Sequence, residues 1–350
     1  MSLQRLTLQG VRNLSPTTLT PGPGLNWLEG KNGAGKTSVI EAIHLLARGR
    51  SFRANAISSV IQHHCEQLLI VADTGAGDRL GVSRDPQGWT GRINGEDCQR
   101  VSEFARRLPL ILIEPESHRL VSAGPERRRQ FMDWLLFHVE PDYLSVWQRY
   151  QKLLRQRNAA LKNGSATAVI EALEQPMAVA ADQINAWRDQ EVSGLSARIN
   201  NLNQALGLRL PGAVALRYRN GTTAGAPVLA QWAEERQRDR ELGFTRSGPH
   251  RAELVITLAD HPAATEASRG QQKLVAVLLV LAELQRLQAA APAPMVLLDD
   301  PVSELDEGHQ RTLIEWLIAS QLQVWVTATT APPTSAQRFH VEQGEIQSVV

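Results

Sequence analysis

Cysteine, aromatic residues and net charge are all scarce in this chain. Its 350 residues include only 2 cysteines, Cys65 and Cys98, too few for a disulfide framework. We therefore expect reduced thiols in a cytoplasmic protein. The formal net charge is +1, so any surface for a polyanion must arise from local segregation of charge.

Long hydrophobic runs are also missing. The longest, from Leu274 to Ala282, is far shorter than the roughly 20 residues that span a bilayer. The N-terminal residues are too interrupted to form the apolar core of a signal peptide. We therefore expect no membrane partner. A chain of 350 residues should form one large domain or two unequal ones.

The two ends of the chain alternate between strand and helix patterns. Helical spacing of apolar residues occurs at 38–47, 270–287 and 307–318, and strand patterns occur at 3–8, 25–28, 108–113, 295–298 and 323–326. Antiparallel strands are expected between 68 and 93, and further strands at 214–218 and 254–258. The matching order at both ends predicts one α/β layer built from the two termini.

The middle of the chain is different, because strand signals almost vanish from about Glu126 to Leu206. Two long helical patterns, at 142–161 and 176–206, predict an antiparallel pair joined by the polar stretch 162–167 and a short helix. We predict an α/β domain made of 1–115 and 245–350, with 116–244 as an inserted helical subdomain.

A phosphate-binding loop follows the strand at 25–28. The motif GxxxxGK[ST] is formed by Gly30, Lys31, Asn32, Gly33, Ala34, Gly35, Lys36 and Thr37, and Ser38 continues into a helix. Glycines let backbone amides curl around phosphates, and the helix start adds its positive dipole end. Lys36 should reach the β- and γ-phosphates of ATP, and the Thr37 hydroxyl should ligate Mg²⁺. The strand before and the helix after argue against a chance match.

An apolar strand ending in two acids is the expected partner of this loop. Met295 to Leu298 runs into Asp299, which should hold Mg²⁺, and Asp300, which should polarise the attacking water. On its own, a strand followed by a helix-capping aspartate is common. Glu116 and Glu304 remain alternatives for orienting the water.

A second phosphate grip is suggested by Ser268, Gly270 and Gln271, which precede a strongly amphipathic helix. Alone, this segment would be an ordinary helix cap. Its place 31 residues before Asp299 favours a role at the nucleotide, since serine, glycine and a helix start together bind phosphate.

The densest basic region lies in the middle of the chain. Its members are Arg127, Arg128, Arg129, Arg149, Lys152, Arg155 and Arg157. For any single arginine a solvated helix face is the better interpretation, but the cluster favours contact with DNA phosphates. No aromatic residues suggest base readout, so binding should be independent of sequence. His63, His64 and Cys65 have no second ligand pair, so we interpret them as loop histidines with a buried thiol rather than a metal site.

The phosphate loop, the S-x-G-Q segment and the acidic strand end, followed by Ser303 to Asp306, resemble the ABC-type ATPase set. In such proteins the S-x-G-Q segment of one protomer closes on the ATP of the other. Lys36 and Ser268 are 232 residues apart, a separation that resembles the spacing of SMC-like ATPases more than that of transporter cassettes. The switch histidine of those cassettes is absent, and Thr327 or Thr329 is the candidate for its place.

Over nearly its whole length the chain resembles the RecF family. The residues that carry this resemblance are Arg12 and Asn13, Gly49 to Arg53, Pro115 and Glu116, Gly124 to Arg129, Phe131, Asp133, Gly248 to Arg251, Gly270 to Lys273, and Leu298 to Asp300 with Asp306. The resemblance implies that Arg12 and Asn13 join the nucleotide site. It also implies an ABC-type head that forms an ATP-dependent homodimer.

The resemblance further implies a weak, DNA-stimulated ATPase that binds gaps or junctions of single- and double-stranded DNA. Such a protein would work with RecO and RecR to load the recombinase. Two alternatives from other classes remain: the nucleotide-binding subunit of a transporter, and a nucleotide-gated scaffold without a DNA role. The wide motif spacing and the basic insert argue against the transporter subunit.

Overall fold

The structure is a computed structural model and describes residues 2–54, 56–223, 226–290, 293–301, 306–332 and 335–349. Its contacts divide the chain into two compact units. The first comprises Met1–Ser117, Leu206–Leu208 and Leu284–Val350, and the second comprises His118–Ala205 and Arg209–Glu283.

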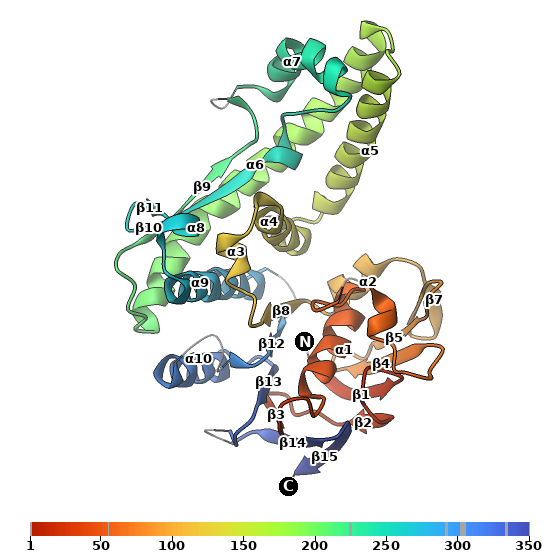
Figure 1. Cartoon of the computed structure of the whole chain (residues 1–350), viewed down its shortest axis with the longest axis vertical. Coiled ribbons are helices and arrows are strands. Elements are labelled where there is room, and N and C mark those ends of the chain that lie inside the picture. The colour runs from red at the N-terminus through yellow and green to blue at the C-terminus, as the bar shows by residue number, and fades with distance from the viewer. Residues whose placement is uncertain are drawn as a thin grey trace. The chain divides into compact units, whose positions relative to one another are not determined.

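A mainly parallel sheet in the first unit has the strand order β15-β14-β3-β13-β12-β8 (Figure 1). Its strands are β3 (Leu25–Glu29), β8 (Leu110–Ile113), β12 (Met295–Leu298), β13 (Val324–Ala328), β14 (Gln337–Glu342) and β15 (Glu345–Val349). All residues of β12 and β13 are buried, as in parallel strands covered on both faces. Neighbouring strands come from opposite ends of the sequence, so the predicted α/β layer is confirmed.

An antiparallel sheet in the same unit has the order β2-β1-β4-β5-β6-β7. Its strands are β1 (Leu3–Gln9), β2 (Thr17–Leu19), β4 (Leu68–Thr74), β5 (Arg79–Arg84), β6 (Trp89–Ile93) and β7 (Glu96–Cys98). Burial alternates strictly along β4, because one face of the sheet covers the core and the other is more open. The antiparallel strands expected between 68 and 93 are therefore confirmed.

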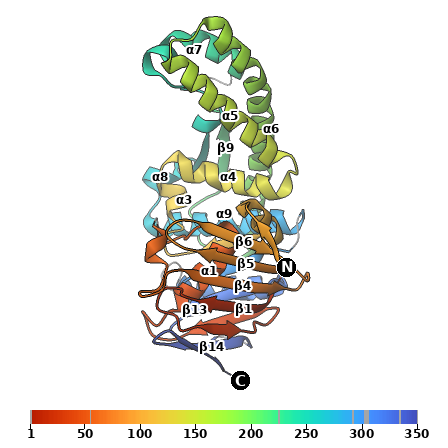
Figure 2. The same cartoon turned by 90° about the vertical axis from the view of Figure 1, so that its right-hand side faces the viewer.

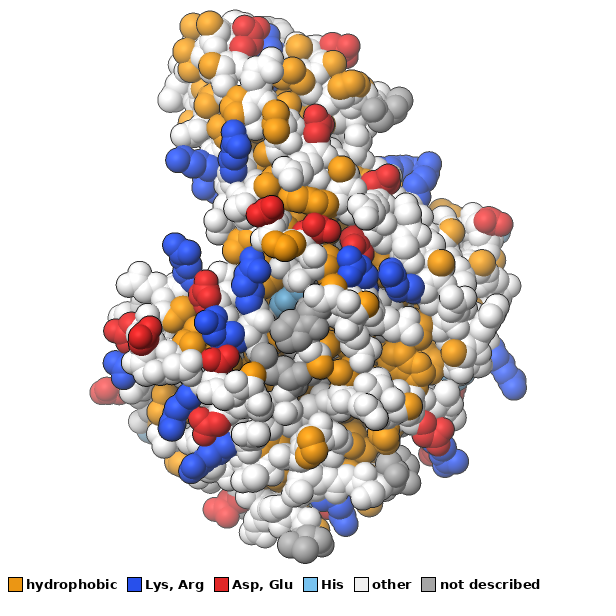
Figure 3. Space-filling view, turned by 180° about the vertical axis from the view of Figure 1, so that it is seen from behind, with side chains coloured by type: hydrophobic (Ala, Val, Ile, Leu, Met, Phe, Trp, Pro, Cys, Tyr) orange, Lys and Arg blue, Asp and Glu red, His pale blue; other side chains and the backbone are white. Residues whose placement is uncertain are grey.

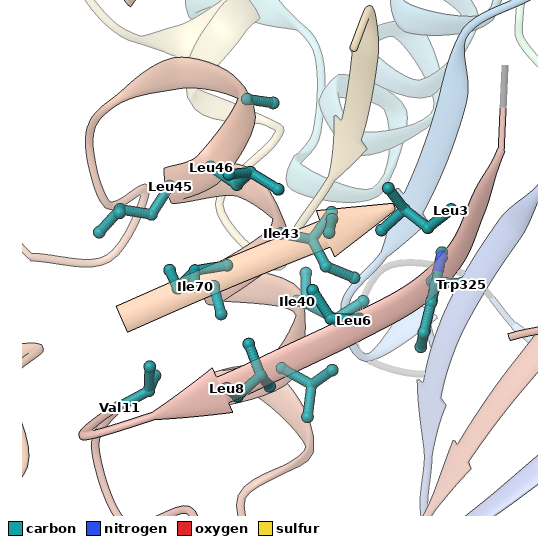
Figure 4. Close-up of a cluster of buried hydrophobic side chains, with 14 of the residues drawn as sticks. Leu3, Leu6, Leu8, Val11, Ile40, Ile43, Leu45, Leu46, Ile70 and Trp325 are labelled. Atoms are coloured by element: carbon teal, nitrogen blue, oxygen red, sulfur yellow. The ribbon is translucent and has the colours of Figure 1, made fainter. Parts of the chain in front are cut away.

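Helix α1 (Lys36–Arg48) lies between these two sheets, in contact with β4, β5 and β13. Figure 4 shows Leu6 and Leu8 of β1 facing Ile40 and Ile43 of α1. All four side chains are fully buried, and such burial stabilises by about 25 cal/mol per Å² of apolar surface. The first turn of α1, which carries the end of the phosphate loop, is thereby held over the sheet.

Two further helices belong to the first unit. Helix α2 (Val101–Arg107) packs on α1. Helix α10 (Glu307–Ala319) follows Asp306, whose carboxylate accepts a hydrogen bond from the backbone N–H of His309. Asp306 is thus a helix cap. Ser303, Glu304 and Leu305, part of the predicted motif, lie outside the described residues.

The second unit is mostly helical (Figures 1 and 2). Its helices are α3 (Arg119–Ser122), α4 (Pro125–Val139), α5 (Tyr143–Lys162), α6 (Thr167–Ala205), α7 (Val228–Leu242), α8 (Ala263–Glu266) and most of α9 (Arg269–Gln288). The predicted pairing of two long helices is confirmed, because α5 and α6 pack along each other.

The predicted short helix before Pro176 is wrong, because α6 continues through this proline. A proline inside a helix removes one backbone hydrogen bond. Here the buried face is continuous on both sides, with Ile170 before Pro176 and Met177 and Ile184 after it. Packing along that face offsets the missing bond, which local propensity cannot reveal.

An antiparallel sheet completes the second unit, in the order β11-β10-β9. Its strands are β9 (Val214–Arg219), β10 (Glu253–Leu258) and β11 (His261–Pro262). This pairing changes one predicted boundary, since residues 245–283 belong to the second compact unit rather than to the first. The physical reason is that β10 hydrogen-bonds to β9 along its whole length. Within the described ranges, no helix is long and apolar enough to cross a membrane.

Candidate functional site

The phosphate loop joins the end of β3 to the start of α1, as the sequence predicts. Gly35 has φ 121°, a left-handed conformation that favours glycine, and a Cβ there would lie 2.8 Å from Leu14 Cδ2. Within the loop, the Ala34 N–H donates to the Lys31 carbonyl at 3.2 Å, and the Ser38 N–H donates to the Gly35 carbonyl at 3.0 Å. The loop therefore has a defined curl that only glycine permits at Gly35.

Lys36 points back into the loop. Its Nζ donates hydrogen bonds to the carbonyls of Gly30 at 2.6 Å and Lys31 at 2.9 Å. Burial lowers the pKa of Lys36, and the negative charges of Asp300 and Asp299 oppose that change. The ammonium group therefore lies at the loop, within electrostatic reach of the two acids that follow β12.

The carboxyl ends of β3, β12 and β13 meet at one edge of the parallel sheet, where polar groups converge. The Thr37 hydroxyl donates to Asp299 Oδ1 at 2.8 Å, and the Thr327 hydroxyl donates to the same oxygen at 2.9 Å. The backbone N–H of Asp300 donates to Thr327 Oγ1 at 2.8 Å. Residues far apart in sequence thereby form one hydrogen-bonded group.

Asp299 is almost fully buried, with 5% exposure. Burial raises its pKa, while hydrogen bonds from Thr37 and Thr327 act in the opposite direction by stabilising the carboxylate. A carboxylate and a hydroxyl this close are oxygen ligands of the kind Mg²⁺ takes, with phosphates and water completing its shell. The predicted Mg²⁺ ligands Thr37 and Asp299 therefore fit that ion.

A carboxylate that sequence reasoning missed, Glu41 of α1, organises the neighbouring wall. It is fully buried and accepts hydrogen bonds from Arg12 Nε and Nη2, each at 2.8 Å. Glu41 also accepts from the Ser51 hydroxyl, and Arg12 Nη1 donates to the Ser59 carbonyl. Arg12 thus braces the wall of the site. The sequence feature that could have indicated the role of Glu41 is a charged residue on the buried face of a helix.

Asn13, the other residue implied by the family resemblance, supports the loop itself. Its side-chain amide donates to the carbonyls of Gly33 and Ala34, both at 3.3 Å. Its Oδ1 accepts from the Ser38 hydroxyl at 3.2 Å. The structure therefore brings Arg12, Asn13 and Ser38 to the phosphate loop.

A cavity of about 940 Å³ opens over these groups. Its predicted lining residues are Arg12, Asn13, Asn32, Gly33, Gly35, Lys36, Thr37, Ser38, Asp300, Thr327 and Thr329. Its unpredicted lining residues are Arg53, Ser58, Ser59, Ile61, Gln62, His63, His64 and Ala328. The volume is within the roughly 300–1,000 Å³ typical of small-molecule sites. The cavity can accommodate a nucleotide whose phosphates lie on the loop.

The interpretation of residues 63–65 needs correction. Cys65 is exposed, not buried, and the two histidines line the cavity. No cluster of three or more histidine, cysteine or acidic side chains suited to a metal occurs in the described part of the chain. No sequence pattern indicated that residues 63–65 lie beside the phosphate loop.

The S-x-G-Q segment belongs to the second unit and forms a capping box at the start of α9. The Ser268 N–H donates to Gln271 Oε1 at 2.8 Å, and the Gln271 N–H donates to Ser268 Oγ at 3.3 Å. Ser268 and Gly270 are exposed. The interpretation as a helix cap is therefore correct locally, and the cap leaves the helix start open to a ligand.

The basic residues of the second unit fall into two groups. Arg149, Lys152 and Arg155 are exposed and project from α5 at intervals of three residues, hence from one side of that helix, which contains no acidic residue. Arg157, by contrast, is fully buried and pairs with Glu174 at 2.8 Å and Asp239 at 2.9 Å. Arg157 therefore joins α5, α6 and α7 and is unavailable to DNA.

The predicted DNA contacts in α4 need a similar correction. Arg128 is 8% exposed, and its guanidinium donates to both carboxylate oxygens of Glu253, at 2.7 and 3.1 Å. Arg129 is half-buried and donates to the Ala252 carbonyl at 2.9 Å. Both side chains attach α4 to the start of β10, and Arg127 remains partly exposed. Figure 3 shows basic and acidic side chains interspersed over one face of the molecule.

Comparison with known proteins decides the family. Residues 2–341 match the RecF/RecN/SMC N terminal domain. A protein of Stenotrophomonas maltophilia (strain R551-3) named DNA replication and repair protein RecF is 37% identical over 369 residues, which cover 100% of both chains. The chain belongs to the RecF family. Its Pseudomonas aeruginosa (strain UCBPP-PA14) relative of the same name is 40% identical, with 99% of this chain and 97% of that protein covered.

Solved structures share the fold. A RecF family structure, described as the recombination mediator protein RecF-ATP in the RecFOR pathway, has a TM-score of 0.89 at 22% identity, covering 100% of this chain and 98% of that chain. The Smc head domain of Pyrococcus furiosus, solved with the C-terminal domain of ScpA, has a TM-score of 0.58 at 16% identity, covering 99% and 96%. The predicted ABC-type head with a helical insertion is confirmed.

Proposed function

We propose that this RecF family member is an ATP-dependent DNA-binding protein of recombinational repair in the cytoplasm. The observation that carries the proposal is the meeting of the phosphate loop with Asp299 through the Thr37 hydroxyl. A hydroxyl and a carboxylate at this position would hold Mg²⁺, which supplies charge neutralisation to the phosphates of bound ATP. Lys36 would place its ammonium group on the β- and γ-phosphates.

Hydrolysis would depend on Asp300, which lines the cavity and whose backbone is fixed by Thr327. Its carboxylate would accept a proton from the attacking water. The alternatives for this role remain Glu116 and Glu304. Glu304 lies outside the residues that the structure describes. We expect slow hydrolysis, stimulated by DNA, that acts as a switch.

The exposed, capped start of α9 supports a site completed by a second copy of the chain. In the dimer, Ser268, Gly270 and Gln271 of one copy would face the γ-phosphate bound by the other. A helix start with free backbone N–H groups stabilises negative charge, so ATP would join the two copies. Nucleotide that contacts both copies only in the closed state shifts the equilibrium toward the dimer.

DNA would be held through its phosphates. The exposed Arg149, Lys152 and Arg155 side of α5 offers positive charge without aromatic readers, which suits sequence-independent binding. We propose gaps and junctions of single- and double-stranded DNA as the targets, with RecO and RecR as partners in loading the recombinase. The pathway named for the RecF family structures supports this choice of partners.

Sedimentation of labelled gapped DNA tests the proposal. With ATP, the native chain should carry the DNA into a complex containing two copies, and Lys36→Met should abolish this complex. Ser268→Asp should abolish it too, because aspartate keeps the helix cap but repels phosphate. The control Thr265→Arg changes an exposed neighbour outside the cap and should behave as native. A chain that stays monomeric with ATP and ignores DNA at low salt would overturn the proposal, and ATP-driven dimers without DNA binding would favour the scaffold.

A further inference from the structure

Thr327, at the carboxyl end of β13, connects the two acids of the site. It is 1% exposed, and its hydroxyl donates to Asp299 Oδ1 at 2.9 Å while accepting from the Asp300 N–H at 2.8 Å. A hydroxyl has one proton to donate and lone pairs to accept. Both bonds can therefore form at once, and together they fix the direction of the hydroxyl.

The backbone of Asp300 needs such a restraint. Its φ is 47°, in the left-handed region, which is unfavourable for a residue other than glycine. The bond from its N–H to Thr327 holds this conformation, in which Asp300 lines the cavity. Loss of that bond would remove one restraint on this conformation and therefore on the direction of the carboxylate.

Asp299 is restrained by the same hydroxyl. Thr37 and Thr327 donate to one oxygen, Oδ1, so each alone leaves the carboxylate less firmly oriented. If Thr37 turns its oxygen toward Mg²⁺, as its proposed role requires, Thr327 is the hydroxyl that still orients Asp299. Groups that orient a metal-binding side chain typically affect metal affinity or activity about 10- to 100-fold.

We propose that Thr327 is a positioning residue that sets both acids of the nucleotide site through one hydroxyl. It aligns Asp299 for Mg²⁺ by donating a proton, and it aligns Asp300 for water by accepting one. This inference rests on the proposed ATPase function. Thr329, the other sequence candidate, lines the cavity but is exposed, whereas Thr327 is the threonine bonded to both acids.

The test compares Thr327→Val, which keeps the shape without the hydroxyl, with Thr327→Ser, which keeps the hydroxyl. The matched control is Thr90→Val, at an exposed position of β6. For Thr327→Val, the affinity for ATP without divalent ions should stay within about twofold of native. The increase in ATP affinity that Mg²⁺ causes should fall about 10- to 100-fold, and kcat should fall by a similar factor. Thr327→Ser should restore both quantities to within a few-fold.

Hydrogen exchange at the Asp300 amide adds a readout independent of catalysis. Native and Thr327→Ser chains should protect this amide, and Thr327→Val should not. Native Mg²⁺ dependence in Thr327→Val would overturn the proposal. Loss of metal-free ATP binding, or failure of Thr327→Ser to restore kcat, would overturn it in favour of a packing role. Failure of the native chain to bind or hydrolyse ATP would instead reject the proposed function.

Discussion

Arg12 and Glu41 form a two-bonded ion pair beside the phosphate loop, with Nε and Nη2 of the arginine each 2.8 Å from a different carboxylate oxygen. Glu41 is fully buried, and its hydrogen bonds, and then its charge, raise the pKa of Arg12. The pair fixes Arg12, which in turn bonds to the Ser59 carbonyl in the cavity wall. Glu41 therefore shapes a site that it does not line.

Glu41→Gln should weaken ATP binding, because it loses the charge that holds Arg12 while keeping nearly the same shape. We expect about a tenfold loss, the equivalent of one charge-assisted hydrogen bond of about 1.5 kcal/mol. Titration calorimetry measures the loss. Combining Glu41→Gln with Arg12→Gln should cost less than the sum of the two single changes. Strict additivity would contradict a shared role. The control is Glu103→Gln, in a partly exposed pair with Arg107.

The exposed side of α5 should carry DNA affinity. Changing Arg149, Lys152 and Arg155 together to glutamine should weaken binding to gapped DNA and make it less dependent on salt. The slope of log binding constant against log salt concentration should flatten by about 0.9 for each lost contact with a duplex phosphate. Changing Arg5, Arg79 and Arg92 to glutamine removes the same charge from exposed positions of the first unit. Fluorescence anisotropy across a salt series compares the two. Equal weakening in both would indicate net charge rather than a DNA surface on α5.

Arg157 should matter for stability instead. Arg157→Gln leaves Glu174 and Asp239 buried without their shared partner, which should cost about 3 kcal/mol of unfolding free energy. Arg155→Gln, two residues away and exposed, should change it by less than about 0.5 kcal/mol. Urea unfolding followed by circular dichroism provides both values. Equal midpoints for the two variants would contradict the structural role.

The helical periodicity of α5 carried a signal that could have separated these arginines. Arg157 shares a side with Tyr150, Leu154 and Leu161, all buried, whereas the exposed cations lie on another side. Arg128 likewise falls on the buried side of α4 with Phe131 and Leu135. Sequence alone could not identify their acidic partners, because Glu174, Asp239 and Glu253 come from other elements.

The phosphate loop and the acidic strand end could be predicted from local sequence patterns alone, since each motif has a fixed spacing of residues and directly follows a strand. Three other features could be recognised only from the tertiary structure. They are the ion pair of Arg12 with Glu41, the hydrogen bonds of Thr327 to Asp299 and Asp300, and the cavity wall formed by residues 58–64. They join the loop to segments that no periodicity connects. The helix through Pro176 shows the same limit, because packing outweighed a local breaking signal.

Stability should fall on acidification because two histidines are buried in the neutral form. Burial lowers the pKa of His44 to about 3 and that of His250 to about 4. An unfolded histidine has a pKa of about 6.5, so the unfolded chain binds more protons below that pH. Each histidine therefore contributes stability that is complete above about pH 6.5 and is lost as pH falls toward its folded pKa, with a slope of up to about 1.4 kcal/mol per pH unit.

Replacing His44 tests this pH dependence. His44 Nδ1 lies 2.8 Å from the Arg50 carbonyl, and the neutral ring donates to it. His44→Asn keeps a donor and removes the titration, so the unfolding free energy of the first unit should depend less steeply on pH between about 6.5 and 4. Urea midpoints at a series of pH values give the slope. A slope as steep as that of the native chain would contradict the assignment of His44.

The central claim, a nucleotide site shared by two copies of the chain, is tested most directly by mixing two inactive variants. Lys36→Met spoils the phosphate loop, and Ser268→Asp spoils the segment offered to the other copy. Each variant alone should hydrolyse no ATP. In a mixed dimer, one site combines both damaged parts and the other combines both intact parts, so the mixture should recover ATP hydrolysis with DNA present. A mixture as inactive as its components, or an active Ser268→Asp chain, would contradict the shared site.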